Sequence, residues 1–170
     1  MASVIMIAGP VGAGKSAVAR ELVAGWTGPL VYIEGDCFWP FIARELPEQS
    51  RPQRFRMTMA SMTAACVPYV RAGYDVLLDF SIPPWFLDTA RAIISAKGFA
   101  LEYVALRPEL AVCAARVAGR EAGRIADYGP YRALYESFDV AAARMVADGP
   151  VDEMATAIRA GLAIGQFRVA

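Results

Sequence analysis

The residues with the clearest chemical capacity lie near the amino end, in the run Gly9-Pro10-Val11-Gly12-Ala13-Gly14-Lys15-Ser16. Glycines allow positive φ angles, so successive backbone N–H groups can converge on one anion. The lysine places a point charge on terminal phosphates, and the serine hydroxyl is a suitable Mg²⁺ ligand. The pattern predicts a loop that holds the phosphates of ATP, with Lys15 catalytic and Ser16 a metal ligand.

Two carboxylates follow predicted strands. Asp36 comes after the apolar run 30–33, and Asp79 lies near the end of the run 74–80. At strand ends, either carboxylate can accept a proton from an attacking hydroxyl or hold Mg²⁺ and its waters. We assign Asp36 as general base and Asp79 as metal ligand, while the choice of base between them stays open. The alternative for Asp36 is an ordinary turn or helix cap.

Arginines spaced by four residues, Arg116, Arg120 and Arg124, occur among the glycines of a segment predicted to be a lid, about 116–130. Arginines in a lid neutralise charge on a transferring phosphoryl group and help to exclude water. Arg116 and Arg120 are therefore predicted to be catalytic, the alternative being a solvated helix edge paired with Glu121 or Asp127. The predicted nucleotide-binding residues are Gly9, Pro10, Val11, Gly12, Ala13, Gly14, Lys15, Ser16, Ala17, Arg116 and Arg120.

A second group of residues lies where an acceptor substrate would bind. Three arginines before a long predicted helix are suited to an acidic substrate or a nucleic-acid strand, or form a solvated face. Aromatic residues near Asp36 suit a ring-shaped acceptor or core packing. These residues are Arg51, Arg54, Arg56, Phe38, Trp39, Phe41 and Trp85.

The elements that must position these residues alternate between short β-rich runs and amphipathic segments. This alternation predicts one α/β domain over residues 1–170, a parallel sheet flanked by helices. The predicted strands are 3–8, 30–33, 74–80, 100–106 and 145–147. The predicted helices are 15–26, 52–72, 84–96, 108–120, 131–143 and 151–163.

Composition narrows the function classes. The chain has 170 residues, of which 56% are hydrophobic, a net charge of zero and no histidine. The balanced charge argues against a general nucleic-acid surface, and the lack of histidine excludes histidine catalysis. The three cysteines form neither a disulfide framework nor a metal motif. The sequence has no apolar run of ~18 residues and no secretion signal, so we expect a cytoplasmic protein. We expect it to be a monomer or a homodimer.

With these residues in place, the chain resembles the small P-loop kinases of the nucleoside-monophosphate-kinase-like group. That group includes gluconate and shikimate kinases, chloramphenicol phosphotransferase and the kinase domain of polynucleotide kinase. The resemblance rests on the ordered motifs GPVGAGKS, IEGD, VLLD and RVAGREAGR. It implies the P-loop NTPase fold, with a five-stranded parallel sheet of order 2-3-1-4-5 and a small lid. It also implies a base at Asp36 and lid arginines on ATP phosphates.

Two departures from the sequence patterns of this group argue against particular acceptor substrates. Residues 79–83 read DFSIP where adenylate kinases carry DGFPR, so the arginine that holds a monophosphate is missing. The histidine that gluconate kinases have soon after the acid is also missing. The expected function is an ATP- and Mg²⁺-dependent kinase acting on a hydroxyl of a small molecule that is still to be identified. A polynucleotide 5′-hydroxyl kinase is the nearest variant, and a nucleotide-binding regulatory NTPase is the alternative of another class.

Overall fold

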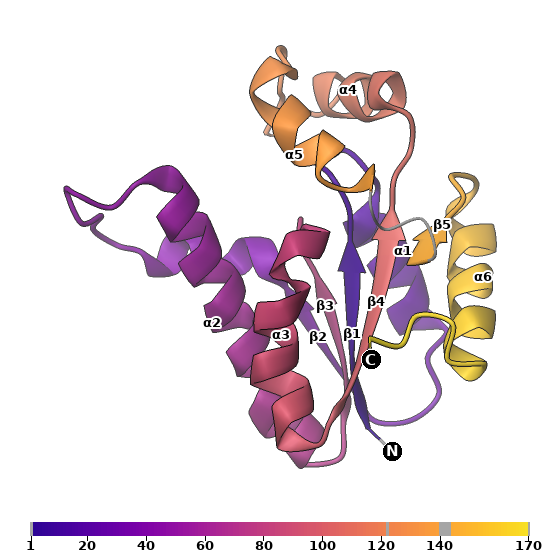
Figure 1. Ribbon diagram of the computed structural model, residues 1–170. Helices are drawn as coiled ribbons and strands as arrows, with labels where there is room; N and C mark the ends of the chain where they lie inside the picture. Colours follow the sequence, from indigo (N-terminus) through magenta and orange to yellow (C-terminus); the bar gives the residue numbers. More distant parts are fainter. Residues whose placement is uncertain (1, 122, 140–143, 170) are drawn as a thin grey trace.

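The computed structural model describes residues 2–121, 123–139 and 144–169. In this part of the chain, five parallel strands form one sheet of order β2-β3-β1-β4-β5 (Figure 1). They are β1 Ser3–Ala8, β2 Leu30–Glu34, β3 Asp75–Asp79, β4 Ala100–Leu106 and β5 Met145–Val146. The predicted α/β fold and strand order are confirmed.

The α-helices are α1 Lys15–Ala24, α2 Arg51–Arg71, α3 Leu87–Ile94, α4 Leu110–Ala118, α5 Arg132–Glu136 and α6 Val151–Ala163. Short 3-10 helices are η1 Gly35–Phe41, η2 Pro84–Phe86, η3 Ser95–Lys97 and η4 Gly129–Tyr131. The helix predicted from residue 108 begins only at Leu110, because Glu109 is extended with ψ 149°. The helix predicted over 131–143 ends at Glu136, and its last four residues lie outside the described part.

Helices cover both faces of the sheet, which explains why its strands are nearly continuous apolar runs. Alternate residues of β1 point to opposite faces. Val4 and Met6 belong to a core that contains Met59 of α2, on the side covered by α2 and α3. Ile5 and Ile7 belong to a second core with residues of α1 and α6. Among the described residues, no helix combines the length and apolar character needed to span a lipid bilayer.

A small upper lobe, built from α4 to α5, stands beyond the carboxyl ends of the strands (Figure 1). It has its own apolar cluster of Cys113, Val117, Tyr128 and Tyr135, against which Val11 packs. Since Val11 lies in the predicted phosphate loop, the lobe is in direct contact with that loop.

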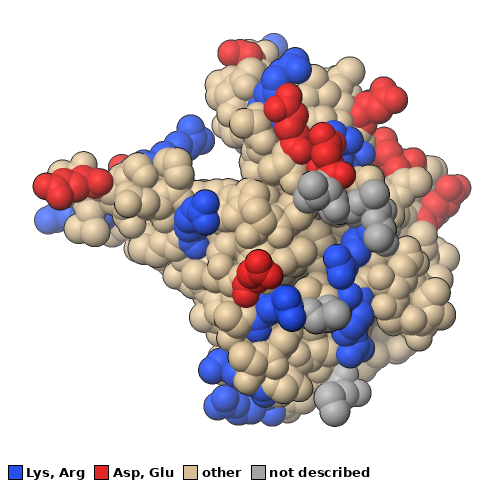
Figure 2. Space-filling view, viewed as in Figure 1, with Lys and Arg blue, Asp and Glu red and all other residues tan. Residues whose placement is uncertain are grey.

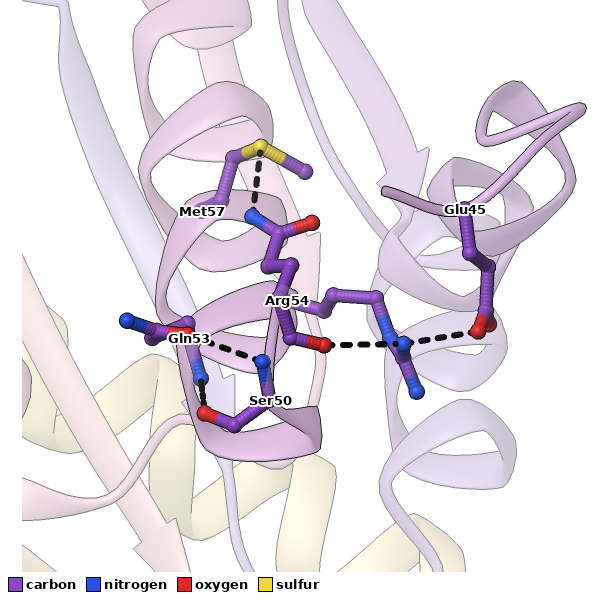
Figure 3. Close-up of polar contacts among 6 residues, drawn as sticks. Glu45, Ser50, Gln53, Arg54 and Met57 are labelled. Carbon is purple, nitrogen blue, oxygen red and sulfur yellow. Dashed lines mark hydrogen bonds and ion pairs between the residues drawn. The ribbon is translucent and has the colours of Figure 1, made fainter. Parts of the chain in front are cut away.

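On the other side of the strand ends, residues 42–50 and the start of α2 form a projecting arm (Figure 1). A capping box begins α2: the Ser50 hydroxyl accepts from the Gln53 backbone, and the Gln53 side chain accepts from the Ser50 backbone (Figure 3). Arg54 reaches back to Glu45 at 2.7 Å. These contacts fix the arm to the helix, and so fix the rim formed by Arg51 and Pro52.

Candidate active site

The phosphate loop connects β1 to α1 in a conformation that its glycines make possible. Gly9, Gly12 and Gly14 have φ values of 154°, 85° and 90°. A Cβ on Gly9 would lie 2.2 Å from the Leu106 carbonyl oxygen, and one on Gly12 would lie 2.4 Å from that of Cys113. Because α1 begins directly after the loop, its N-terminal N–H groups face the same concavity. The loop therefore has the shape and polarity of an anion site.

Lys15 lies at the head of this loop. Its Nζ donates to the Pro10 carbonyl oxygen at 3.0 Å and to the Ser81 hydroxyl at 3.1 Å. Burial lowers its pKa to about 8, while Asp79 and Asp36 oppose this shift. An anion at the loop would favour the charged ammonium. The site thus holds a lysine that loses its proton more readily than usual, and a bound phosphate would oppose that loss.

Asp79 ends β3 behind the loop and is only 3% exposed. Neither of its carboxylate oxygens has a hydrogen-bond partner in the part of the chain described. Burial raises its pKa, and the Ser16 hydroxyl and Lys15 oppose that shift. A buried, unpartnered carboxylate beside a serine hydroxyl is an oxygen-only donor set, which suits Mg²⁺.

Figure 2 shows the molecule hollowed between the arm and the upper lobe. A cavity of about 790 Å³ is lined by the phosphate loop and by residues of η1, α2 and the upper lobe. Lys15, Ser16, Asp36 and Arg120 all contribute to its wall. The structure therefore brings together these four predicted site residues from three separate segments: the phosphate loop with the start of α1, η1, and the upper lobe.

Asp36 projects from η1 as an exposed side chain on the cavity wall. The buried Gly35 before it allows this placement: a Cβ there would lie 2.7 Å from Phe80 Cβ and 2.8 Å from the Asp79 carbonyl oxygen. Asp79, by contrast, is not part of the wall. The open carboxylate is the better placed of the two to meet an acceptor hydroxyl.

The predicted lid arginines separate in the structure. Arg120 lines the cavity, beyond the end of α4 at Ala118, whereas Arg124 does not line it. The Arg116 guanidinium pairs with Asp148 at 3.1 Å, and its Nη1 lies 3.9 Å from the Cβ position of Gly14. Arg116 is thus beside the loop but bound to a residue before α6.

The arginine cluster before α2 also divides. Arg51 lines the cavity, and Arg54 is held by Glu45 and by the Gln49 carbonyl oxygen. The Arg56 guanidinium lies over the ring of Trp85, 4.3 Å from its centre. The three side chains therefore do not form one continuous basic patch.

The predicted aromatic residues split in the same way. Trp39 and Trp85 line the cavity. Phe38 is half-buried against the core, with its ring centre 5.1 Å from that of Phe41, which is 74% exposed. Of these four predicted residues, only the two tryptophans line the cavity.

Several residues of the site were not predicted. Phe55, Phe80 and Tyr131 line the cavity, and Ser81 accepts the Lys15 hydrogen bond. The Tyr128 hydroxyl donates to the Val11 carbonyl oxygen at 2.6 Å. Phe55 has the helical spacing of a core residue, so the sequence pattern predicts a place in the core and not on a cavity wall. Ser81 does carry a signal in the sequence, since it lies two residues after the strand that ends at Asp79.

Comparison with known proteins agrees with this geometry. A family model described as AAA domain (AAA_33) matches residues 4–144. A search of curated proteins found no significant match. The fold is similar to a tunicamycin resistance protein from Deinococcus radiodurans, with a TM-score of 0.69 and 19% identity over 100% of this chain and 99% of that one.

Two kinases share the fold at similar distance. An APS kinase from Mycobacterium tuberculosis, solved with AMPPNP and APS, has a TM-score of 0.69 and 19% identity over 95% of this chain and 98% of that one. A sugar kinase from Janibacter sp. HTCC2649 has a TM-score of 0.68 and 18% identity over 98% and 97%. The resemblance to small P-loop kinases inferred from the motifs is confirmed at the level of fold and family.

Proposed function

We propose that this chain, which belongs to the AAA domain family AAA_33, is a kinase that transfers the γ-phosphoryl group of ATP to a hydroxyl of a small molecule. One observation carries the proposal: Asp36 and Lys15 share a single cavity wall, with the phosphate loop at one end and room for an acceptor at the other. Its kinase-fold relatives support the same enzyme class.

The phosphate end supplies binding and charge. The loop's N–H groups and the N-terminus of α1 would hold the phosphates. Lys15 and Arg120, which both line the cavity, would contact the γ-phosphoryl group. Ser16 would hold Mg²⁺, with Asp79 behind it; the ion would supply neutralisation of charge on the β- and γ-phosphates. Arg116 would join after leaving Asp148.

The acceptor end supplies the base. The acceptor oxygen attacks the γ-phosphorus while its O–H proton passes to the Asp36 carboxylate. The bond from the γ-phosphorus to the bridging oxygen breaks, and ADP leaves. Because phosphoryl transfer depends mainly on positioning and charge, these few groups account for the chemistry.

The other two candidate functions receive less support. A polynucleotide acceptor needs a row of free cations, but Arg54 is paired with Glu45 and Arg56 is stacked on Trp85. A regulatory NTPase has no use for an exposed carboxylate on the wall of an acceptor cavity. The position of Asp36 on such a wall therefore favours a kinase.

The test is ADP release with Mg²⁺-ATP across a library of hydroxylated acceptors. The library contains sugars, sugar acids, nucleosides, aryl alcohols and 5′-hydroxyl oligonucleotides. We expect acceptor-dependent release that falls about 10²- to 10⁴-fold in kcat for Asp36→Asn, with ATP affinity unchanged, because only the proton acceptor is lost. Lys15→Ala should lose both ATP affinity and turnover.

Matched controls are available in the chain. Asp88→Asn makes the same change at an exposed aspartate on α3, and Lys97→Ala removes the second lysine, in η3. Both should behave like the parent protein. Slow ADP release that no acceptor increases, and that Asp36→Asn leaves intact, would refute the kinase proposal in favour of a regulatory NTPase.

A further inference from the structure

The acceptor end of the cavity is formed by a continuous group of rings, here called the aromatic wall: Trp39, Phe55, Phe80 and Trp85. Phe55 is its centre. Its ring lies 6.2 Å from Trp39 with an interplanar angle of 10°, 5.8 Å from Phe80 and 6.4 Å from Trp85. Four rings from η1, α2, the end of β3 and η2 thus meet on one side of the cavity.

The wall adjoins the proposed base. Asp36 and Trp39 lie three residues apart on η1, and one turn of a 3-10 helix places such residues on the same side. An acceptor whose hydroxyl reaches Asp36 must therefore lay its body along the wall. The upper lobe closes this region with Ile125, Tyr131 and Leu134.

The four rings themselves offer an acceptor few polar groups, namely the two indole N–H groups of Trp39 and Trp85. Two serines of the cavity lining already form hydrogen bonds within the protein: Ser81 accepts from Lys15, and Ser137 donates to the Leu134 carbonyl oxygen at 2.6 Å. A polyol laid along these rings would lose water from several hydroxyls and regain few hydrogen bonds from the ring surface, which is unfavourable. A flat apolar group would instead exchange water for ring contacts.

We propose that the acceptor is an aryl alcohol, with its ring against the aromatic wall and its hydroxyl at Asp36, rather than a sugar, a sugar acid or a mononucleotide. This inference rests on the proposed kinase function and deepens it by naming the substrate class. Arg56, stacked on Trp85, holds the outer ring of the wall in place.

The experiment compares matched acceptors with Mg²⁺-ATP. 2-Phenylethanol and 2-cyclohexylethanol differ only in the flatness and π-system of the ring, while glucose, gluconate and adenosine represent the excluded classes. We expect kcat/KM for 2-phenylethanol about threefold above that for 2-cyclohexylethanol and at least about tenfold above the others. Phe55→Leu should raise KM for 2-phenylethanol about tenfold with kcat little changed.

Binding is measured separately from turnover. A nitroaryl alcohol, 4-nitrobenzyl alcohol, quenches nearby tryptophans, and two of the chain's three tryptophans belong to the wall. The third, Trp26, packs in the core on the α1 side of the sheet. Saturable quenching should be retained in Trp26→Phe and weakened in the double variant Trp39→Phe with Trp85→Phe. Tyr69→Leu, at an exposed ring of α2 outside the cavity, is the control for ring loss on that helix.

The outcomes separate the two proposals. Turnover of glucose or gluconate at or above that of aryl alcohols would overturn the aromatic assignment and leave the kinase function standing. Quenching that Phe55→Leu weakens, without turnover of any acceptor, would refute the kinase function while retaining a ring-binding wall. An equal loss in Phe55→Leu and Tyr69→Leu would show general destabilisation and overturn the assignment.

Discussion

The two ends of the cavity are built in opposite ways. The phosphate end is made of backbone from one contiguous run, residues 9–16, in which glycine conformation determines the shape. The acceptor end is made of side chains from η1, α2, η2 and the upper lobe, which meet only after folding. A backbone cradle of this shape suits a phosphate, whereas a wall of side chains can be altered by substitution to suit a different acceptor.

The electrostatics of the two ends differ as well. The phosphate end keeps buried titratable groups in unfavourable states: the pKa of Lys15 is lowered to about 8 and that of Asp79 is raised, both chiefly by burial. Such groups gain when a ligand supplies the missing counter-charge. The acceptor end has Asp36 on an exposed surface and rings around it.

The largest effect should come from adding a Cβ to the backbone cradle. In Gly12→Ala, φ of 85° and a 2.4 Å approach to the Cys113 carbonyl oxygen oppose loop closure, so ATP affinity should fall about a hundredfold. Gly28→Ala is the control: its φ is 110°, but a Cβ there meets nothing within 4 Å. Calorimetric titration measures the ATP affinity of both variants. Equal losses of ATP affinity would mean that the strain of a positive φ explains the effect without the contact to Cys113.

A smaller effect should follow from neutralising the buried carboxylate. Asp79→Asn should raise the Mg²⁺ concentration for half-maximal activity roughly thirtyfold, because outer partners of a metal site orient its ligands. The melting temperature without nucleotide should rise, since burial is the main cause of the raised pKa of Asp79.

Asp75→Asn, at the opposite end of β3, is the control for that change. Asp75 accepts a hydrogen bond from the Ser3 backbone at 2.9 Å, so this variant should lose stability without altering the Mg²⁺ requirement. A fall in the melting temperature of Asp79→Asn would instead assign its carboxylate a structural role.

The contrast between a contiguous phosphate loop and an acceptor end assembled from separate segments also explains which parts of the site could be predicted from the sequence. The loop 9–16 is one contiguous run, so a sequence motif was enough to predict it. The order of the strands was predicted from the resemblance to small P-loop kinases. Asp36 and Asp79 were predicted as site residues because strand ends mark the ligand edge of a parallel sheet. Phe55 was hidden because helical spacing does not distinguish a cavity from a core. The pairing of Arg116 with Asp148 joins positions 32 residues apart, which no local pattern encodes.

The third prediction is that ATP binding at the phosphate end depends on pH. With a Lys15 pKa of about 8 in the free protein, ATP binding at higher pH requires proton uptake, so the Kd for ATP should rise about tenfold between about pH 7 and pH 9. Over the same range, the stability of the free protein should gain from Lys15, because the unfolded lysine, with pKa 10.5, stays protonated while the folded one does not.

Calorimetry in buffers of different ionisation enthalpy measures this proton uptake. Lys15→Ala should abolish it, whereas Lys97→Ala, at the chain's other lysine, should retain it. A Kd for ATP that stays constant from about pH 7 to pH 9 would contradict the lowered pKa. Binding of an aryl alcohol, measured by tryptophan quenching, should depend on pH less than ATP binding does, because an uncharged acceptor does not require the charged form of Lys15.

The smallest effect concerns the contact between the upper lobe and the loop. The Tyr128 hydroxyl donates to the Val11 carbonyl oxygen at 2.6 Å, and burial raises its pKa, so it remains a donor at ordinary pH. Tyr128→Phe should raise KM for ATP about fivefold with kcat little changed, because the loop loses one positioning hydrogen bond. Tyr135→Phe is the control, since its hydroxyl donates at 2.9 Å to the carbonyl oxygen of Pro108, between β4 and α4, and not to the phosphate loop. If both variants raise KM equally, the lobe acts through its stability; if only Tyr128→Phe does, the backbone cradle depends on one side chain that reaches it from 117 positions away.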